Sequence, residues 1–254
     1  MKTEVYDQIN ELEKDHWWYK GMFALSRDQL EKYVFRSPAG SGKCTILDIG
    51  CGTGYWTEEL LGRGIVIAAD NSRKALAICR RRGLNNLIEC SADALPISSE
   101  SCDLITALGV IEHLDDDRGL AREMQRALQP GGYGVILTSA YMFLWSEHDD
   151  VAYHKRRYTA AEMKDIMRRA GLEVVKLSYV NFFMFLPVML IRLARSIKFS
   201  KDRPSAGSRS PDLYMPPLLV NKALYSLLRI ESKILKYTDL PFGISLFMVV
   251  KKSG

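Results

Sequence analysis

The chain has 254 residues, of which 47% are apolar and 26% are charged, which suits one large globular α/β domain with an elaboration. Its N-terminal segment is rich in acidic residues and has no apolar core, which excludes a signal peptide. The five cysteines form neither a CxxC pair nor a Cys/His cluster. This pattern argues against a disulfide framework and a metal site, and it predicts a cytoplasmic protein.

Charge is unevenly distributed along the chain. Residues 1–150 hold 16 Lys/Arg and 23 Asp/Glu, a net charge of −7, whereas residues 151–254 hold 19 Lys/Arg and 7 Asp/Glu, a net charge of +12. The basic C-terminal portion indicates an anionic partner, such as a lipid head group, a phosphorylated intermediate or a nucleic acid. The alternative is a basic face that contacts only solvent.

Residues 4–35 are predicted to be helical, because they contain no proline and one glycine. Within them, the run His16–Tyr19 (HWWY) places two tryptophans side by side, and adjacent residues do not share one helix face. One tryptophan is expected to pack on the core while the other covers a neighbouring element. A loop rich in Pro and Gly follows at Ser37–Lys43.

The stretch Thr45–Trp56 (TILDIGCGTGYW) combines an apolar run, a glycine-rich turn and the start of a helix. The apolar run is typical of a buried parallel strand. Three glycines, Gly50, Gly52 and Gly54, follow at alternate positions, so the backbone can approach a ligand closely at a helix N-terminus. The sequence therefore predicts a ligand-binding turn between the first strand and its helix.

The spacing of these glycines decides between ligands. A dinucleotide turn requires G-x-G-x-x-G, but the third position is Tyr55 when counted from Gly50 and Thr57 when counted from Gly52. No Gly-Lys-Ser/Thr closes the turn, which excludes a P-loop. The acid before the turn, Asp48, suits a ligand with a cationic ammonium group. The pattern D-x-G-x-G-x-G resembles motif I of the class I S-adenosylmethionine (SAM)-dependent methyltransferases, in particular those that act on small molecules.

The same resemblance extends to the N-terminal helix. The run His16–Tyr19 is similar to the aromatic opening of one bacterial and archaeal subgroup, and many class I members have N-terminal helices that close over the cofactor. We expect Tyr19 or Trp145 to offer an aromatic face to the cationic sulfonium. The alternative for the aromatic run is a staple that holds the first helix.

Acidic residues follow the next two predicted strands. The apolar run Ile65–Ala69 ends at Asp70 and Asn71, and an acid at this strand tip is placed to accept both hydroxyls of a ribose. The resemblance implies that Asp70 and Asn71 contact the ribose of SAM. Ser72 is predicted to cap the helix Arg73–Arg82.

A third strand is predicted at Leu87–Cys90, followed by the loop Ser91–Pro96. The resemblance implies that the Asp93 side chain contacts the adenine amino group and that the backbone amide of Ala94 contacts a ring nitrogen. The alternative for Asp93 is an Asx turn before the proline.

The fourth predicted strand, Cys102–Ala107, leads into a turn that should lie over the sulfonium. The resemblance implies that Leu108 lines the cofactor and that Glu112 and His113 point toward the acceptor. His113 capping the following helix is the alternative. That helix is expected to begin at Asp115–Asp117, where the helix dipole favours negative charge.

A sharp turn is predicted at Gln129–Gly132, before a fifth strand at Val135–Thr138. Strands that alternate with helices predict a parallel, doubly wound sheet, which binds ligands beyond the carboxyl ends of its strands. We therefore expect an α/β fold of Rossmann-like type. Its features would be a seven-stranded, mostly parallel sheet, helices on both faces, an antiparallel last strand and a helical C-terminal insertion.

An aromatic, acidic and basic block follows the fifth strand, and it resembles the D-x-x-x-x-H-x-R-R-Y-T block of the same subgroup. We expect it to form a loop over the acceptor. Its candidate catalytic bases are His148, His154 and Tyr158. Arg156 and Arg157 are candidates to hold a phosphate or carboxylate of the acceptor. Alternatively, Arg157 and Tyr158 tie the loop to the body, and Thr159 only caps the next helix.

The C-terminal third begins with a predicted sixth strand at Leu172–Tyr179. The segment Leu177–Ile191 has 15 uncharged residues, fewer than the roughly 18 needed to span a bilayer. It is predicted as an interfacial amphipathic helix or as a lid over a hydrophobic pocket. A polar stretch at Lys198–Pro211, a helix at Leu218–Tyr237 and a last strand at Ile244–Val250 complete the chain.

These observations divide the chain into four parts: an N-terminal helical cap (1–40), a SAM-binding core (41–180), a helical insertion (181–241) and the last core strand (242–254). Membrane contact is expected through 181–198 if that segment is not a substrate lid. The location expected is the cytoplasm, with or without membrane association, and the oligomeric state is left open.

The function predicted is methyl transfer from SAM, which becomes S-adenosylhomocysteine, to an oxygen, nitrogen or carbon atom. The acceptor would be a small molecule or a lipid-linked intermediate, attacked in line. One alternative is a NAD(P)-dependent oxidoreductase, which the missing third glycine disfavours. The other is a non-catalytic SAM-fold adaptor at membranes. No nucleic-acid partner is expected, because the chain lacks the Asn/Asp-Pro-Pro-aromatic segment of amino-methylating enzymes.

Overall fold

The computed structural model describes residues 3–35, 44–198 and 214–254, with side chains up to residue 194 in the second range. The loop expected at Ser37–Lys43 and nearly all of the polar stretch expected at Lys198–Pro211 lie outside the described residues. The strands are β1 (Cys44–Ile49), β2 (Gly64–Asp70), β3 (Leu87–Glu89), β4 (Cys102–Leu108), β5 (Leu128–Ser139), β6 (Leu172–Val180) and β7 (Ser245–Lys252).

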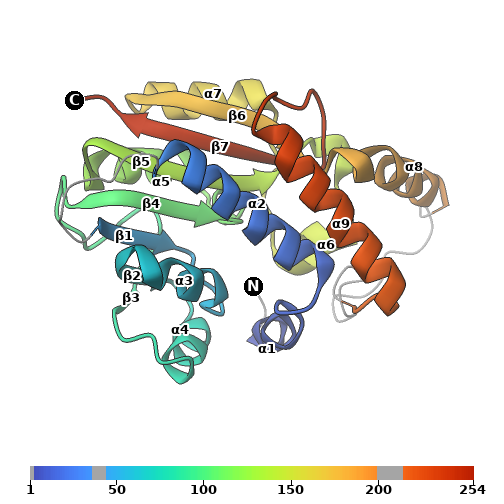
Figure 1. Cartoon of the computed structure of the whole chain (residues 1–254), viewed down its shortest axis with the longest axis horizontal. Coiled ribbons are helices and arrows are strands. Elements are labelled where there is room, and N and C mark those ends of the chain that lie inside the picture. The colour runs from blue at the N-terminus through green and yellow to red at the C-terminus, as the bar shows by residue number, and fades with distance from the viewer. Residues whose placement is uncertain (1–2, 36–43, 199–213) are drawn as a thin grey trace.

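Helices connect these strands and flank the sheet (Figure 1). The α-helices are α1 (Thr3–Leu12), α2 (Trp17–Tyr33), α3 (Tyr55–Leu60), α4 (Arg73–Arg81), α5 (Asp117–Ala127), α6 (Glu147–Ala152), α7 (Ala160–Arg169), α8 (Phe182–Lys198) and α9 (Leu218–Leu235). Three short 3-10 helices are η1 (Leu61–Arg63), η2 (Ile111–His113) and η3 (Met142–Leu144).

Within the described residues, seven strands form one sheet in the order β3-β2-β1-β4-β5-β7-β6. The pairs β1–β2, β2–β3, β1–β4 and β4–β5 are parallel, whereas β7 runs antiparallel to both β5 and β6. The strand order reverses at β1, and such a switch point is where open α/β sheets bind ligands. The predicted fold class, including the antiparallel last strand and the helical insertion before it, is confirmed.

The strands are apolar because both faces of the sheet are covered. On one face, α2, α3 and α9 bury Met22, Leu25, Trp56, Leu60 and Leu228 against Ile46, Leu104, Val135 and Val249. On the other face, α5 and α7 bury Leu120, Met124, Met163 and Met167 against Leu47, Ile105, Ile136 and Met248. Neighbouring residues of one strand thus enter opposite cores, as the pleat requires.

The N-terminal helix α2 and the C-terminal helix α9 lie together on one face, although they are far apart in the sequence (Figure 1). A Cβ atom built on Gly21 would lie 2.2 Å from Leu228 Cδ1, so only glycine permits this approach. The side chain of Asn221 accepts a hydrogen bond from Trp17 N and donates one to Asp15 O, both at 2.8 Å. The N-terminal segment and the insertion therefore form one helical layer.

Two local predictions differ from the structure. The helix predicted over residues 4–35 is two helices, because His16 begins α2 by accepting a hydrogen bond from Trp18 N at 3.3 Å. The sharp turn predicted at Gln129–Gly132 lies inside β5, which already begins at Leu128. Leu128 pairs with Cys102 of β4 and Tyr133 pairs with Leu104, so the residues of β5 between them form a local irregularity in the pairing.

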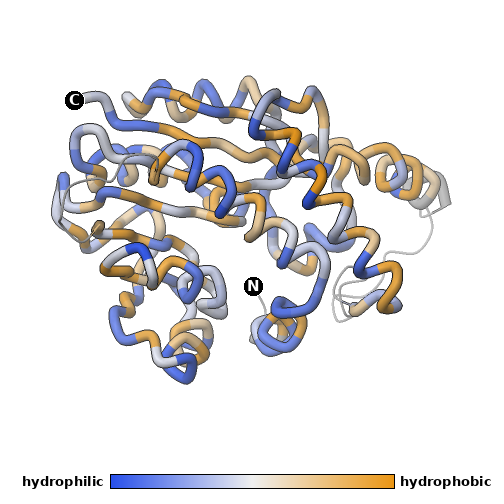
Figure 2. Tube along the Cα trace, viewed as in Figure 1, coloured by the Kyte–Doolittle hydropathy of each residue, from blue (hydrophilic) through white to orange (hydrophobic). Residues whose placement is uncertain are grey.

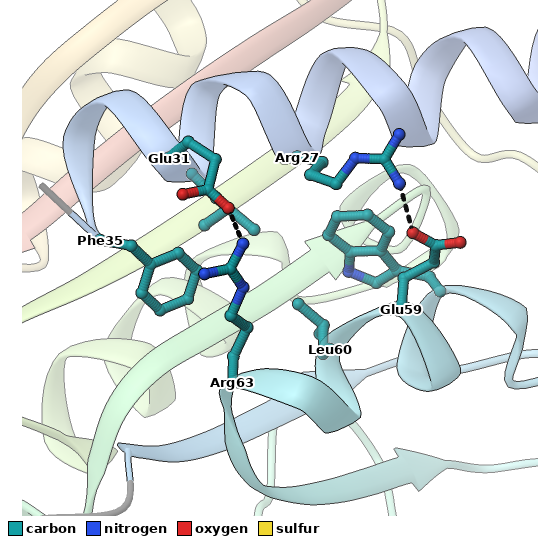
Figure 3. A pocket seen from close by; sticks show the side chains of 8 residues that line it. Arg27, Glu31, Phe35, Glu59, Leu60 and Arg63 are labelled. Carbon is teal, nitrogen blue, oxygen red and sulfur yellow. Dashed lines mark hydrogen bonds and ion pairs between the residues drawn. The ribbon is translucent and has the colours of Figure 1, made fainter.

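No helix among the described residues is both long and apolar enough to cross a membrane. A small pocket lies between α2 and α3 and is bordered by two ion pairs, Arg27–Glu59 and Arg63–Glu31 (Figure 3). It includes Phe35, just after the C-terminal end of α2, and Leu60, at the end of α3 opposite the glycine turn. The ligand-binding edge is therefore a different region.

Candidate active site

The glycine turn between β1 and α3 is shaped by backbone conformations and packing that favour glycine. Gly50, Gly52 and Gly54 have φ angles of 65°, 55° and 81°. A Cβ atom would lie 2.4 Å from Val110 Cγ2 at Gly50 and 2.8 Å from Cys79 Sγ at Gly54. At Gly52 it would meet nothing closer than Gly50 O at 4.0 Å. Two glycines are thus required by packing, whereas the third leaves open space over the backbone.

Asp48 lies buried beneath this turn. Its Oδ1 accepts a hydrogen bond from Thr106 Oγ1 at 2.7 Å, and its Oδ2 accepts one from Thr57 Oγ1 at 2.6 Å. Burial raises the pKa of Asp48 to about 6. The sequence suggested a carboxylate that faces the ligand's ammonium group, but Asp48 instead joins β1 to α3 and β4 and supports the turn from below.

Asp70, at the end of β2, lies beside the turn. Its Oδ2 accepts a hydrogen bond from Gly52 N at 2.9 Å and its Oδ1 accepts one from Ser72 N at 2.8 Å. Burial raises the pKa of Asp70, although these backbone donors oppose the rise. Asn71 follows and is exposed. The Asp70 carboxylate therefore holds the turn and marks the strand tip where a ribose is expected.

Tyr6 of α1 covers the same strand tip. It is buried and packs against Ala75 and Ile78 of α4. Burial, together with the nearby charge of Asp70, raises the pKa of Tyr6 to about 12. The first helix thus closes this side of the ligand edge.

A buried ionic group fixes the segment between α1 and α2 to the glycine turn. Glu13 accepts hydrogen bonds from Thr53 Oγ1, in the turn itself, and from the guanidinium of Arg82. Arg82 also donates to Glu58 Oε2 at 2.8 Å and lies 5.6 Å from the ring centroid of Tyr55. Burial raises the pKa of Glu13 despite these partners. The N-terminal segment is therefore held by charge-assisted hydrogen bonds.

Tyr19 belongs to an aromatic cluster on the inner side of α2. Its ring centroid lies 5.0 Å from that of Trp18 and 6.3 Å from that of Phe23, which in turn stacks on Trp56 at 5.6 Å. Burial, followed by the charge of Glu13, raises the pKa of Tyr19 well above its ordinary range. The structure thus places Tyr19 between the Glu13 group and the helix that follows the glycine turn.

The loop after β3 carries the two residues expected to read adenine. Ser91 Oγ donates a hydrogen bond to Asp93 Oδ1, and the start of α5 packs against the Asp93 side chain at Gly119. The amide of Ala94 donates to Ser91 O at 3.2 Å. The contact of the Ala94 amide with adenine, which the resemblance implies, stays a prediction. Leu108 lies half-buried at the end of β4.

The residues on this edge fit a SAM-like nucleoside better than a dinucleotide. Open space lies over Gly52, and the acidic strand tip of Asp70 stands next to it. The two possible third positions of a dinucleotide motif hold Tyr55 and Thr57 instead of the glycine that such a motif requires. Asp70 and Asp93 are the side chains that would hold the nucleoside hydroxyl and amino groups.

The loop after β5 is organised around Asp149, which is fully buried. Arg157 binds it in a bidentate pair, Nε to Oδ1 at 2.8 Å and Nη2 to Oδ2 at 2.9 Å. His154 Nδ1 lies 2.7 Å from Asp149 Oδ1. Burial alone would raise the pKa of Asp149, but His154 and Arg157 outweigh it and hold that pKa far below its usual range. Asp149 is thus a carboxylate that anchors a histidine and an arginine.

Two further histidines lie beside His154. The ring centroid of His113 is 4.7 Å away and that of His148 is 5.8 Å away, both in edge-on contact. Burial lowers the pKa of His113, which favours its neutral form at neutral pH. The amide of Lys155 donates to Glu112 O at 2.8 Å and so fixes this loop to η2. The three histidines therefore form one group at the carboxyl ends of β4 and β5.

Tyr158 does not lie open toward an acceptor. It is 3% exposed, and its hydroxyl lies 3.2 Å from Ile111 O and 3.1 Å from Asp117 Oδ2. Burial raises the pKa of its hydroxyl well above the ordinary range. Arg156 likewise donates to Asp117 Oδ2 at 2.9 Å. These contacts tie the loop to the body, the second of the two roles that the sequence left open for Tyr158.

Several residues of the site were not singled out from the sequence. Tyr6, Glu13 and Arg82 carry no local motif, and Glu13 meets Arg82 across 69 positions of sequence. Asp149 did carry a signal, because Asp149, His154 and Arg157 are the D, the H and the second R of the recognised block. If the residues of this block are assumed to contact one another, the block predicts that Asp149 anchors His154 and Arg157.

Comparison with known proteins agrees with this geometry. Residues 47–136 match the family model described as a methyltransferase domain. The chain is 27% identical over 216 residues to a ubiquinone biosynthesis O-methyltransferase of Aeromonas salmonicida, covering 72% of this chain and 89% of the relative. It is 32% identical over 136 residues to mouse tRNA (carboxymethyluridine(34)-5-O)-methyltransferase ALKBH8, covering 51% of this chain but only 18% of that protein.

Solved structures share the fold. A SAM-dependent methyltransferase of Thermotoga maritima aligns with a TM-score of 0.58 and 19% identity, over 98% of this chain and 96% of that one. A Haemonchus contortus phosphoethanolamine N-methyltransferase in complex with SAM aligns with a TM-score of 0.56 and 18% identity, over 89% of this chain and 53% of that one. The fold is thus that of Rossmann-like methyltransferases.

Residues 47–136 therefore match a methyltransferase domain, and the chain is similar to the class I SAM-dependent methyltransferases in sequence and in fold. SAM is the cofactor of this family. The match covers the second half of β1, all of β2, β3 and β4 with their connections, and most of β5, which are the elements that form the cofactor edge.

Proposed function

We propose that this protein transfers the methyl group of SAM to an oxygen atom of a small-molecule acceptor. Support for oxygen comes from the relatives, since both the Aeromonas salmonicida and the mouse protein are named as O-methylating enzymes. Support for a small molecule comes from the former, which this chain covers over 89% of its length. An acceptor hydroxyl loses a proton on methylation, and the site contains a histidine group suited to that task.

The observation that carries the proposal is the open backbone at Gly52 beside the buried carboxylate of Asp70. Asp70 would hold the ribose, Asp93 would meet the adenine, and Leu108 would line the sulfur end. Tyr6, with Glu13 behind it, would close the edge from outside. SAM, when bound, supplies a methyl group on a positively charged sulfur. The protein's task is then to position the acceptor oxygen and exclude water.

His154 is the base that we propose. A carboxylate only accepts hydrogen bonds, so the contact with Asp149 places the proton of His154 on Nδ1. In that tautomer of the neutral ring, Nε2 is the nitrogen suited to accept a proton from a hydroxyl, as in other Asp-His pairs. His113, whose pKa is lowered by burial, and His148 are the neighbours through which a proton could leave. Tyr158 is not proposed as a base, because its hydroxyl donates a hydrogen bond to Asp117 Oδ2 beneath the loop.

A transfer assay with methyl-labelled SAM tests the acceptor class. The label should appear in a simple catechol or in the small molecules of a total lipid extract. Label that appears only in bulk tRNA would overturn the small-molecule assignment in favour of an acceptor like that named for the mouse relative. No label in any fraction, from protein shown to bind SAM, would contradict catalysis.

The base is tested by His154→Ala, with His148→Ala as the neighbouring control. We expect His154→Ala to lower kcat by roughly 10²–10⁴-fold and to remove the lower limb of the pH–rate profile, since the general base is lost. The affinity for S-adenosylhomocysteine should stay unchanged. Equal kcat and an unchanged pH profile in His154→Ala would eliminate it as the base.

A further inference from the structure

Helix α8 is apolar on both its inner and its outer face. Its first ten residues, Phe182–Ile191, contain no charged residue. On the inner face, the rings of Phe182 and Phe185 lie 4.6 Å and 5.1 Å from that of Phe242. A helix that is hydrophobic all round is normally buried all round. In the part of the chain that the structure describes, only the inner face of α8 is covered.

The outer face of α8 is exposed. Phe183, Leu186 and Leu190 are spaced i, i+3 and i+7, so they share one side of the helix, and they are 39%, 56% and 56% exposed. Phe143 of η3 is also exposed and lies 6.4 Å from the ring of Phe185. Figure 2 shows the apolar character of α8, which extends beyond the sheet. We call Phe143, Phe183, Leu186 and Leu190 the outer apolar face.

The start of α8 is held firmly by α9. The buried carboxylate of Glu231 accepts hydrogen bonds from Asn181 N at 2.5 Å and from Phe182 N at 2.8 Å. A carboxylate at a helix N-terminus is also favoured by the helix dipole. The outer apolar face is therefore presented in a defined direction by a buried contact.

The outer apolar face lies at the ligand-binding edge of the sheet. β5 and β6 both pair antiparallel with β7, and Ser139 and Val180 both lie opposite Ser245. The carboxyl ends of β5 and β6 therefore lie at the same edge, and α8 begins directly after β6. Surface contact there would take place next to the opening of the active site.

Charge around this face favours an anionic partner. α8 contains Arg192, Arg195 and Lys198 in its last seven residues and contains no acid. Residues 181–230 hold eight Lys/Arg and two Asp/Glu, a net charge of +6. Two copies of this chain meeting through this face would bring these like charges together. An apolar helix face with cations beside it is instead the pattern of interfacial, membrane-surface helices.

We propose that the outer apolar face docks on the surface of an anionic lipid bilayer. The side chains of Leu186 and Leu190 enter the boundary between head groups and acyl chains, and the net positive charge of this part of the sequence favours anionic head groups. This docking needs no methyl donor, so it can succeed or fail independently of the proposed methyl transfer.

Vesicle flotation tests the proposal on the full chain without SAM. We expect binding to vesicles of phosphatidylcholine mixed with phosphatidylglycerol, weaker binding at high salt, and weaker binding to phosphatidylcholine alone. Leu186→Glu/Leu190→Glu should lower the partition coefficient by at least about tenfold, because two apolar anchors become charged. The control is Leu61→Glu, a leucine that is 51% exposed on η1, and it should bind like the wild type.

Each remaining outcome would overturn the proposal. Wild-type protein that stays unbound to anionic vesicles at low salt would do so. Equal binding by the wild type and the double variant would place the contact elsewhere. A dimer that sediments as such and is lost in the double variant, without vesicle binding, would assign the face to a second copy. Thermal unfolding of both variants checks that they are folded.

Discussion

The two halves of the ligand edge are built in different ways. On the cofactor side, the shape resides in the backbone: three glycines with positive φ angles lie against buried carboxylates that accept backbone or hydroxyl hydrogen bonds. On the acceptor side, the shape resides in side chains: an ion pair at Asp149, a group of histidines and an aromatic helix. The first arrangement suits a cofactor shared by a whole family, and the second suits a substrate that varies.

The acceptor side should be the more sensitive to loss of a single charge. In Asp149→Asn, the guanidinium of Arg157, whose side chain is 2% exposed, loses its counterion in a buried place. We expect the free energy of unfolding to fall by about 3–5 kcal/mol, as for other broken buried pairs. Urea unfolding measures this change.

Asp165→Asn is the matched control, because it removes the same charge from an exposed pair with Arg169. Exposed pairs of this kind contribute little, so its unfolding free energy should change by less than about 0.5 kcal/mol. Similar losses in both variants would show that the Asp149 group does not organise the acceptor side.

On the cofactor side, adding a single methyl group to a glycine should already lower stability and cofactor binding. Gly50→Ala requires a residue with a Cβ atom at a φ angle of 65° and places that atom 2.4 Å from Val110 Cγ2. We expect a loss of roughly 2–4 kcal/mol in unfolding free energy, from backbone strain and overpacking, together with weaker cofactor binding. Both are measured by urea unfolding and calorimetry.

Gly83→Ala separates strain from packing. Gly83 has a similar φ angle of 85°, but a Cβ atom there would meet nothing within 4 Å. Gly83→Ala should lower the free energy of unfolding by only roughly 1 kcal/mol and leave cofactor binding unchanged. If Gly50→Ala is no worse than Gly83→Ala, the close contact with Val110 does not shape the turn.

The smallest effect is expected at Glu231, where α9 contacts the start of α8. Burial raises the pKa of Glu231 from 4.5 to about 7. The folded state therefore binds this proton more tightly than the unfolded chain, so the contribution is fully present below about pH 4.5 and is lost as the pH rises through about 7. Relative to Glu231→Gln, whose amide does not titrate, the wild type should lose roughly 1–2 kcal/mol between pH 5 and 8.

Unfolding of both proteins by urea at several pH values checks this, since groups common to both cancel in the difference. A wild type that gains stability over Glu231→Gln as the pH rises would reverse the sign and refute a buried carboxyl with a raised pKa.

The sequence predicts the cofactor side better because its information is local. A strand, alternate glycines and an acid at the next strand tip lie within a short stretch. The residue types that such a turn requires can therefore be recognised in the sequence. Even there the direction of Asp48 could not be predicted, because its partner Thr106 is 58 positions away. Gln129–Gly132 has the composition of a turn, but it lies inside β5 as an irregularity between Leu128 and Tyr133, which both pair with β4.

The acceptor side depends on contacts between distant residues. His113 and His154 are neighbours only because η2 and the loop after β5 meet, and Glu13 reaches Arg82 only when α1 folds back over α4. Helical periodicity also shows that α8 is apolar but not which of its faces the rest of the chain covers. Tertiary packing determines which distant residues meet and which helix face is covered, and a pattern of residue types does not predict that packing.

The central claim is that a SAM-type nucleoside lies over Gly52 beside Asp70. Calorimetric titration with S-adenosylhomocysteine tests this most directly, using the wild type and Asp70→Ala. We predict saturable binding to one site in the wild type, and a loss of about 1–3 kcal/mol in binding free energy in Asp70→Ala, because charge-assisted hydrogen bonds are removed. Folded wild-type protein that shows no saturable binding of either S-adenosylhomocysteine or SAM would contradict the account.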